Sequence, residues 1–403
     1  MRMNVRLHSP LKRLLPLTVA VSVAVFSLPT TAGSLERAKR IHDRLTGVPP
    51  SASVLADMQT LLGSDPIAAA NLAMDNPAFY NATLKNWASP WTNRDDNKFA
   101  PLNDYTATVI GVVRDRLDYR RVLYDNILYV PNSGTYGAYS SSNNNAYVAL
   151  ENSGANMGST SVLQLATQSG VPSNATAGVM TTRAAARAFF IDGTNRAMFR
   201  FTLKNHLCND MEQVQDTTRP ADRIRQDVPR SPGGDSRLFM NGCVGCHSGM
   251  DPMAQAFAYY DFNYDKTAAD QDAAKDAGQI QYTAGTVQPK YFINANHFNE
   301  GFVTPDDRWD NYWRAGPNTA IFGWSSPNSG IVGGNGAKSM GQELANSEAF
   351  AVCSVKKVFQ AVCLRDPASS DQSAFDSMVS SLKSHNYDLK RTFAEVAVHC
   401  SGT

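Results

Sequence analysis

The stretch of sequence best equipped for chemistry is MNGCVGCHSGMDP, in which two cysteines three residues apart are followed directly by a histidine. The thiols of Cys243 and Cys246 can each add to one vinyl group of a haem, and His247 can then bind the iron as its proximal ligand. One helical turn presents both sulfurs to the macrocycle edge, and Gly245 and Gly249 leave room for its close approach. This spacing predicts a single, covalently bound haem c.

Three other interpretations of the same residues are open. A C-x-x-C pair is also the redox dithiol of thioredoxin-like proteins, but that site needs a βαβ setting, of which the flanking sequence shows no sign. A zinc site needs a second closely spaced pair, whereas Cys353 and Cys363 are ten residues apart. The third interpretation is a structural disulfide within the motif, with the histidine there by chance.

A second, distal ligand for the iron has to come from elsewhere in the chain. Met250 and Met253 continue the proximal helix and would lie on the wrong side of the ring. Met340 follows a glycine-rich stretch, GGNGAKSMG, that would let a thioether reach the iron, although Met340 is equally well explained as a helix residue that packs in a core. The candidates of both kinds, thioether and imidazole, are Met211, Met340, His206 and His297.

The N-terminus has the pattern of an export signal. Basic residues without an acidic one precede an apolar run from Leu14 to Leu28, and small residues follow before Gly33. We expect residues 1–32 to be cleaved, because the run is shorter than the roughly 20 apolar residues of a spanning helix; a retained membrane anchor is the alternative. Haem c is attached outside the bacterial cytoplasm, so a periplasmic or extracellular protein is expected, with no transmembrane segment after cleavage.

Charge and length narrow the range of partners. Without residues 1–32 the chain would carry 33 basic and 36 acidic residues, a net charge of −3. This balance gives no basis for nucleic-acid binding. The remaining length of about 370 residues exceeds one typical core, so two or three subdomains are expected.

The four cysteines outside the motif are even in number and can form two disulfide bonds in an oxidising compartment. Cys353 and Cys363 fall in one predicted helix and would be about 15 Å apart at 1.5 Å per residue, too far to bridge each other. We therefore expect Cys400 to pair with one of them, and Cys208 to take the remaining thiol if a second bridge forms.

Helical periodicity dominates the chain, so we expect a mainly α fold: helical subdomains around a c-type haem segment, with an irregular insert rich in aromatic residues. The insert contains Trp309, Trp313 and Trp324, and its aromatic stretch at 291–324 is expected to offer a substrate or partner surface. The expected C-terminal helices are 340–362, 375–382 and 389–398. The expected regions are an N-terminal helical region (33–130), a Gly/Ser/Asn-rich loop region (131–180) with a long exposed loop at 131–160, a haem c-binding region (181–262), an irregular aromatic-rich lobe (263–335) and a C-terminal helical region (336–403).

The segment around the motif, CVGCHSGMDPMAQAFAYYDF, resembles the pattern C-x-x-C-H-x-x-[IM]-D-P-x-x-x-A-[FL]-x-x-[FY]-D of the planctomycete-type cytochrome c proteins. AGVMTTRAAARAFF and the C-terminal helical segment are also similar to parts of that family. The resemblance implies Cys243 and Cys246 as thioether sites and His247 as proximal ligand. It also implies that Asp251-Pro252 ends the haem helix and that Asp261 closes the segment. Compared with the family's usual pattern, we expect a shorter protein without the additional N-terminal modules and with an unusual aromatic insert.

These features favour a monohaem c-type cytochrome that transfers single electrons to a redox partner protein. A haem enzyme, such as a peroxidase or oxidase, is the first alternative; it needs a distal base, and no histidine lies in a recognisable distal motif. An extracellular binding or assembly protein with a structural haem is the second alternative. The family that the motif resembles has no defined activity, so the resemblance implies a haem c but no substrate.

Overall fold

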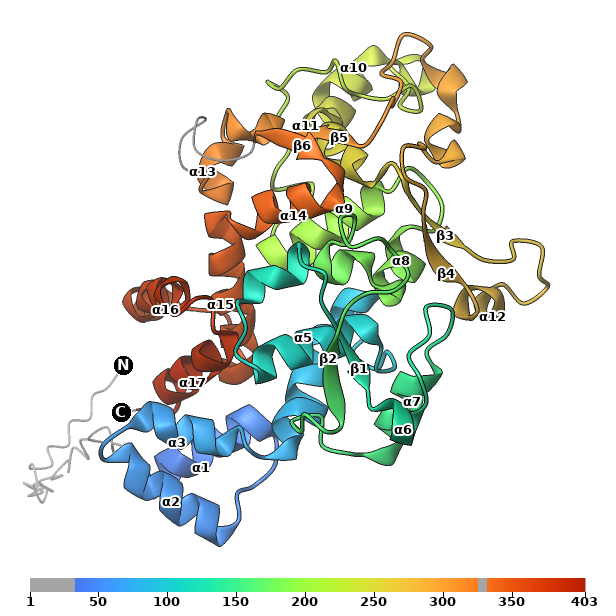
Figure 1. Ribbon diagram of the computed structural model, residues 1–403. Helices are drawn as coiled ribbons and strands as arrows, with labels where there is room; N and C mark the ends of the chain where they lie inside the picture. The colour runs from blue at the N-terminus through green and yellow to red at the C-terminus, as the bar shows by residue number, and fades with distance from the viewer. Residues whose placement is uncertain (1–32, 325–331, 403) are drawn as a thin grey trace, which may run out of the picture.

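The computed structural model describes residues 33–324 and 332–402 of the chain. Within these ranges the fold is mainly helical, as predicted, and three antiparallel two-stranded sheets lie among the helices (Figure 1). None of the helices in these ranges is long and apolar enough to cross a membrane. The predicted signal peptide, residues 1–32, lies outside the described residues.

The elements are α-helices of 3 to 16 residues, short 3-10 or π helices and short strands. In the first half they are α1 (Ser34–Thr46), α2 (Ala52–Leu62), α3 (Pro66–Ala73), η1 (Phe79–Leu84), α4 (Lys85–Ala88), η2 (Ser89–Thr92), α5 (Asp104–Arg114), η3 (Tyr119–Leu123), β1 (Leu128–Pro131), α6 (Ser133–Tyr136), α7 (Asn145–Ser153), β2 (Leu163–Ala166), η4 (Gly178–Thr181), α8 (Arg183–Phe189), α9 (Arg196–Thr202) and η5 (Leu203–Leu207). Those of the second half are η6 (Pro232–Gly234), α10 (Ser236–Leu238), η7 (Phe239–Cys243), α11 (Val244–Ala254), η8 (Gln255–Phe257), β3 (Tyr260–Asn263), α12 (Gln271–Asp276), β4 (Gln279–Tyr282), η9 (Pro289–Phe292), η10 (Ala295–His297), β5 (Arg308–Asp310), η11 (Tyr312–Arg314), α13 (Asn318–Phe322), β6 (Gly333–Asn335), α14 (Gly336–Ala345), α15 (Glu348–Cys363), η12 (Ser369–Asp371), α16 (Gln372–Ser384) and α17 (Leu389–Cys400).

The two ends of the described chain pack against each other. α17 contacts α1 and α3, and α15 contacts α1, α16 and α17, so the blue and red helices lie side by side in Figure 1. Their apolar faces follow the 3.6-residue period, and Ile41, Phe359 and Phe393 are fully buried between them. One hydrophobic cluster includes these residues and the buried residues of the central helices. The expected subdomains therefore share a core within the described residues.

Residues 131–180 are not the loop region that we expected. β1 pairs with β2, and α6 and α7 lie between them. Tyr147 and Leu150, one turn apart on α7, are almost completely buried, as is Leu163 of β2. The loop prediction was wrong because a few apolar residues at helical or strand spacing are buried and stabilise a helix and a strand pair in this segment. They do so although Gly, Ser and Asn dominate its composition.

The insert at 263–335 is built from short elements, with the β3–β4 hairpin and α12 at one side of the molecule (Figure 1). Trp309, Trp313 and Trp324 belong to the main core, and none is more than 4 % exposed. The rings of Trp313 and Phe322 stack with their centroids 5.6 Å apart. The hypothesis of an aromatic binding surface is therefore wrong for the three tryptophans, because their rings pack inside the protein.

The C-terminal region is helical as predicted, but the expected helix over 340–362 is divided into α14 and α15. α14 ends at Ala345, with Asn346 as its C-cap, and Ser347 precedes the first residue of α15. Its hydroxyl accepts a hydrogen bond from the Phe350 backbone N–H at 3.2 Å, which makes it the N-cap of α15.

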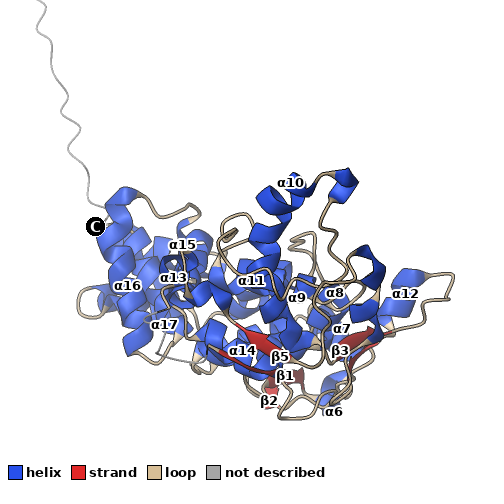
Figure 2. Cartoon of the chain, turned by 90° about the horizontal axis from the view of Figure 1, so that it is seen from above, coloured by secondary structure: helices blue, strands red, loops and turns tan. Residues whose placement is uncertain are grey.

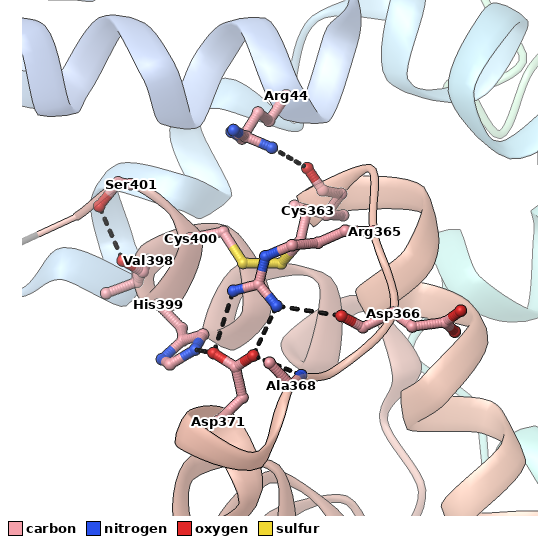
Figure 3. The surroundings of a disulfide bond; sticks show 11 residues. Arg44, Cys363, Arg365, Asp366, Ala368, Asp371, Val398, His399, Cys400 and Ser401 are labelled. Atoms are coloured by element: carbon pink, nitrogen blue, oxygen red, sulfur yellow. Dashed lines mark hydrogen bonds and ion pairs between the residues drawn. A yellow bond between two sulfur atoms is a disulfide. The ribbon is translucent and has the colours of Figure 1, made fainter.

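Two disulfide bonds hold this region together, and their pairing confirms the sequence-based expectation. They are Cys208–Cys353 and Cys363–Cys400. The second joins the ends of α15 and α17 (Figure 3). Beside it, Asp371 accepts hydrogen bonds from Arg365 Nη2 at 3.0 Å and His399 Nε2 at 2.9 Å. The C-terminal helices are thus tied to each other and, through Cys208, to the end of η5.

Candidate functional site

Cys243, Cys246 and His247 lie on one continuous helix, residues 236–257, formed by α10, η7, α11 and η8 and here called the motif helix. The backbone at each junction is right-handed helical, so the four pieces form one helix without a break. α11 packs against α9, β5 and η11. In Figure 2, α10 rises above the neighbouring helices. The second half of the motif helix is therefore embedded, whereas its first turn projects from the body.

The motif helix does not end at Asp251-Pro252, contrary to what the family resemblance implies. α11 continues for two residues beyond Pro252 and then tightens into η8. Pro252 has no amide hydrogen and so removes one hydrogen bond from the helix, and it is buried. Asp261, which the resemblance places at the end of the segment, lies in β3, 2.6 Å from Lys290 Nζ.

The two motif cysteines are free thiols, whereas the other four cysteines are paired. Cys246 Sγ donates to the Met211 carbonyl at 3.6 Å, and Cys243 packs against a small apolar cluster. That cluster consists of Ile224, Val228, Phe239 and Val244. Burial, with the neighbouring Cys243, raises the pKa of the Cys246 thiol. A redox dithiol needs a lowered thiol pKa, so this environment disfavours the thioredoxin-like interpretation.

The two motif glycines make room for protein neighbours rather than for a macrocycle, which corrects their predicted role. A Cβ atom at Gly249 would lie 2.0 Å from Nε1 of Trp313. A Cβ atom at Gly245 would approach the Gln215 side chain to 3.2 Å. The Gly245 carbonyl also accepts the backbone N–H of Asp216 at 2.8 Å. Both glycines therefore let other segments approach the motif helix closely.

His247 has one ring nitrogen held by the protein. Its Nδ1 lies 3.1 Å from Oδ1 of Asp251, one turn further along the same helix. In the neutral imidazole, Nδ1 then carries the hydrogen and donates it to the carboxylate, which leaves the lone pair of Nε2 available to a metal. No residue in the described ranges forms a hydrogen bond with Nε2. This arrangement is the one that an iron-binding histidine requires.

Asp251 is itself buried and held by arginines. Arg196 donates to its two carboxylate oxygens at 2.6 and 2.8 Å and also binds Asp227 at 2.6 and 2.9 Å. The backbone N–H of Arg225 donates to Asp251 at 3.3 Å. Burial alone would raise the pKa of Asp251, but Arg196, Arg225 and His247 together lower it well below its usual value. Asp251 is therefore a charged acceptor that fixes the ring of His247.

No sequence pattern indicated Arg196, Arg225 or Asp227 as site residues. The pairing of His247 with Asp251 could have been predicted from their spacing, because residues four apart share a helix face. Arg196 lies 55 residues before Asp251 and has no motif of its own. Only the fold brings α9 against α11 and so places this guanidinium at the site.

Two of the candidate distal ligands lie near the motif helix. Met211 is one, since its carbonyl oxygen accepts the thiol hydrogen bond described above. His297 is exposed in η10, and the next residue, Phe298, is connected to the motif helix through Arg230. The guanidinium of Arg230 lies 4.4 Å from the ring of Phe298 and 4.7 Å from that of Phe239. Iron binding by Met211 or His297 stays a prediction.

The other two candidates are buried in the core. Met340 is fully buried within α14, which packs mainly against η3, η8 and β6. This burial supports the interpretation of Met340 as a core residue, and its role as distal ligand stays a prediction. His206 is buried between aromatic rings, and its Nε2 lies 2.7 Å from the hydroxyl of Tyr105. Burial lowers the pKa of His206 to about 3.

The donor set around the motif fits a haem c better than a metal ion bound by the protein alone. Among the residues that the structure describes, no group of three or more His, Cys, Asp or Glu side chains could hold a metal. This disfavours the zinc interpretation. The motif contains two free thiols within one helical turn, and Nε2 of His247 is available because only Nδ1 is held. These are the groups that a covalently attached porphyrin needs.

Comparison with known proteins finds no match: no family model, no curated protein and no solved structure is significantly similar to the chain. The argument for function therefore depends on the residues and geometry of the chain.

Proposed function

We propose that the chain is an exported monohaem c-type cytochrome, with haem c bound through Cys243 and Cys246 and with His247 as its proximal iron ligand. The observation that carries the proposal is the division of the six cysteines. Four form disulfides, and two stay thiols in the turn before a histidine whose Nδ1 is held by a carboxylate. The two disulfides support folding in the periplasm or outside the cell, where haem c is attached.

When bound, haem c supplies an iron that takes up and releases one electron. The residues of the chain hold and orient it. His247 presents Nε2, while Asp251 fixes the tautomer and raises the basicity of the ring. Leu238 and Met240, in the two turns before Cys243, are 57 % and 58 % exposed and offer apolar contacts to a flat macrocycle.

Single-electron transfer to a redox partner protein is the function that these residues support best. Among the described residues, Asp251 is the acid or base that contacts the ring of His247. No second acidic or basic side chain of the described ranges contacts this ring to donate or accept a proton in a reaction. The similarity of the motif to planctomycete-type cytochrome c proteins supports the same cofactor.

A haem enzyme of the peroxidase or oxidase type is the second candidate, and the contact between His247 and Asp251 is compatible with it. The charged carboxylate of Asp251 increases the electron donation of His247 to iron, which stabilises the oxidised state and suits reaction with peroxide. The same contact also suits a low-potential electron carrier. The two candidates therefore differ in the distal ligand rather than on the proximal side.

The cofactor is tested by acid-acetone extraction of the protein made in a host with the haem c attachment machinery. We expect the haem to stay on the polypeptide, and we expect the Cys243→Ser/Cys246→Ser variant to release it. A colourless wild-type protein would contradict the proposal.

The activity is tested by an optical spectrum followed by stopped-flow mixing with hydrogen peroxide. Electron transfer predicts a six-coordinate, low-spin ferric spectrum and no turnover of a reducing dye. A high-spin ferric spectrum with rapid, peroxide-dependent dye oxidation would favour the enzyme instead.

A further inference from the structure

A second site lies away from the motif helix, in a pocket of about 890 Å³ formed by α1, α4, η2, η5 and α15. Its apolar wall contains the indole rings of Trp87 and Trp91, whose centroids are 4.5 Å apart. Pro90 and Leu364 extend that wall. The volume falls within the range of 300–1,000 Å³ that is typical of small-molecule sites.

Lys357 of α15 is one of the cations that line this pocket. Its ammonium lies 5.1 Å from the centre of the Trp91 ring. Within the described ranges no carboxylate or carbonyl oxygen accepts a hydrogen bond from it. Asp96 is the acidic residue that acts on Lys357, and it is already paired with Lys204 at 2.5 Å. An ammonium that is mostly buried without a partner is costly, unless an anion joins it.

The side chains around Lys357 carry an excess of positive charge. The basic residues that line the pocket outnumber the acidic ones, and Asp43, the other carboxylate, is paired with Lys39 outside the pocket. The basic residues are Arg40, Arg44, Lys98, Lys204 and Lys357. Arg40 and Arg44 each donate one hydrogen bond to a backbone carbonyl. A carbonyl carries no net charge, so these bonds leave the positive charge of both guanidinium groups in place. The pocket therefore attracts anions.

The interior side of the pocket supports the same conclusion. His206 lies behind Lys357 and is neutral, because burial and the charge of Lys357 lower its pKa to about 3. Burial also lowers the pKa of Lys357, to about 8, so the ammonium form is retained at neutral pH. No other basic group behind the pocket competes for a bound anion among the described residues.

We propose that this pocket binds an organic carboxylate with a flat apolar body, the carboxylate at Lys357 and the body against Trp87 and Trp91. The ammonium of Lys357 selects a negatively charged ligand, and the indole rings provide a flat apolar surface for the body of that ligand. Binding depends on residues remote from the motif and does not require the cofactor assignment to be correct.

The test is isothermal titration calorimetry of the full holoprotein with 2-naphthoate and with its neutral analogue 2-naphthamide. We expect wild type to bind 2-naphthoate at least tenfold more tightly than 2-naphthamide. The Lys357→Met variant should lose at least tenfold in affinity for 2-naphthoate. Lys356→Met, one position earlier on α15 and outside the pocket, is the matched control and should bind as wild type does.

Equal binding of the acid and the amide by wild type would overturn the proposal, as would the absence of binding at millimolar concentration. An unchanged affinity in a folded Lys357→Met variant would also overturn it. The comparison of acid with amide needs no variant, so the proposal stays testable if Lys357→Met fails to fold.

Discussion

The motif helix and the disulfide region, which comprises η5, α15 and α17, use the same residue types in opposite ways. In the disulfide region all four cysteines are bonded, and His206 uses Nε2 for a hydrogen bond to Tyr105. In the motif helix both cysteines are free, and His247 keeps Nε2 available while Asp251 holds Nδ1. The partners of a cysteine or histidine, rather than its presence, therefore separate a structural role from a chemical one.

The strongest test of this comparison removes each pair of cysteines in turn. The Cys208→Ser/Cys353→Ser variant should lose about 5 kcal/mol of unfolding free energy, because the bond closes a loop with a sequence separation of 145 residues. It should retain its haem. Urea denaturation and the absorption spectrum measure the two effects.

The Cys243→Ser/Cys246→Ser variant should show the reverse: no loss of a loop constraint, and no attached haem. If this variant also kept covalent haem, or if the first variant lost it, the division between the two regions would be wrong.

The second test breaks the charged contact of the motif helix. Asp251→Asn leaves Arg196 paired with Asp227 alone, and removal of one member of a buried ion pair costs about 3–5 kcal/mol. The reduction potential should rise, because a neutral amide donates less to the His247 ring. Urea denaturation and a redox titration measure these changes.

Glu348→Gln is the control for that variant. It breaks the ion pair between Glu348 and Lys383, and both of these side chains are substantially exposed. The free energy of unfolding should therefore change by about 1 kcal/mol or less. An unchanged reduction potential in Asp251→Asn would show that the contact with His247 is not functional.

The third test uses the titration of His206. Its pKa in the folded protein is lowered to about 3, whereas the unfolded value is about 6.5. Between these values the unfolded state binds the extra proton, so stability is lost as the pH falls from 6.5 towards 3. One proton gives a slope of about 1.4 kcal/mol per pH unit.

His206→Gln keeps a polar side chain and removes the titration, so its stability should fall less steeply than that of wild type between pH 6 and pH 5. Urea denaturation at these two pH values measures the difference. Parallel slopes would mean that His206 is protonated in the folded protein, despite its burial beside Lys357 and Tyr105.

The smallest expected effect concerns Met340. Met340→Leu conserves volume in the core and should cost less than about 1.5 kcal/mol. Because Met340 is enclosed in α14, we expect the ferric absorption spectrum to stay the same. A change to a high-spin spectrum would show that Met340 reaches the iron, as the glycine-rich approach predicts.

Local patterns in the sequence predicted the local features of the structure. The helices at the chain ends, the placement of Cys243, Cys246 and His247 on one helix, and the exclusion of a Cys353–Cys363 bridge all follow from periodicity or from distance along one helix. Residues 131–180 were misjudged because a few buried residues outweigh a polar composition.

Long-range contacts could not be predicted in this way. Arg196 reaches Asp251 because α9 packs on α11, and Trp313 packs against Gly249 because the insert folds into the core. No spacing rule relates residues 55 positions apart, so both the support of His247 and the role of Gly249 required the fold.

The most direct test of the central claim is the intact mass of the wild-type protein, made in a host that attaches haem c and measured under denaturing conditions. The account predicts the mass of the polypeptide plus one haem, with the added mass on the peptide that contains Cys243 and Cys246. A mass equal to that of the polypeptide alone, with these two cysteines free or joined to each other, would contradict it.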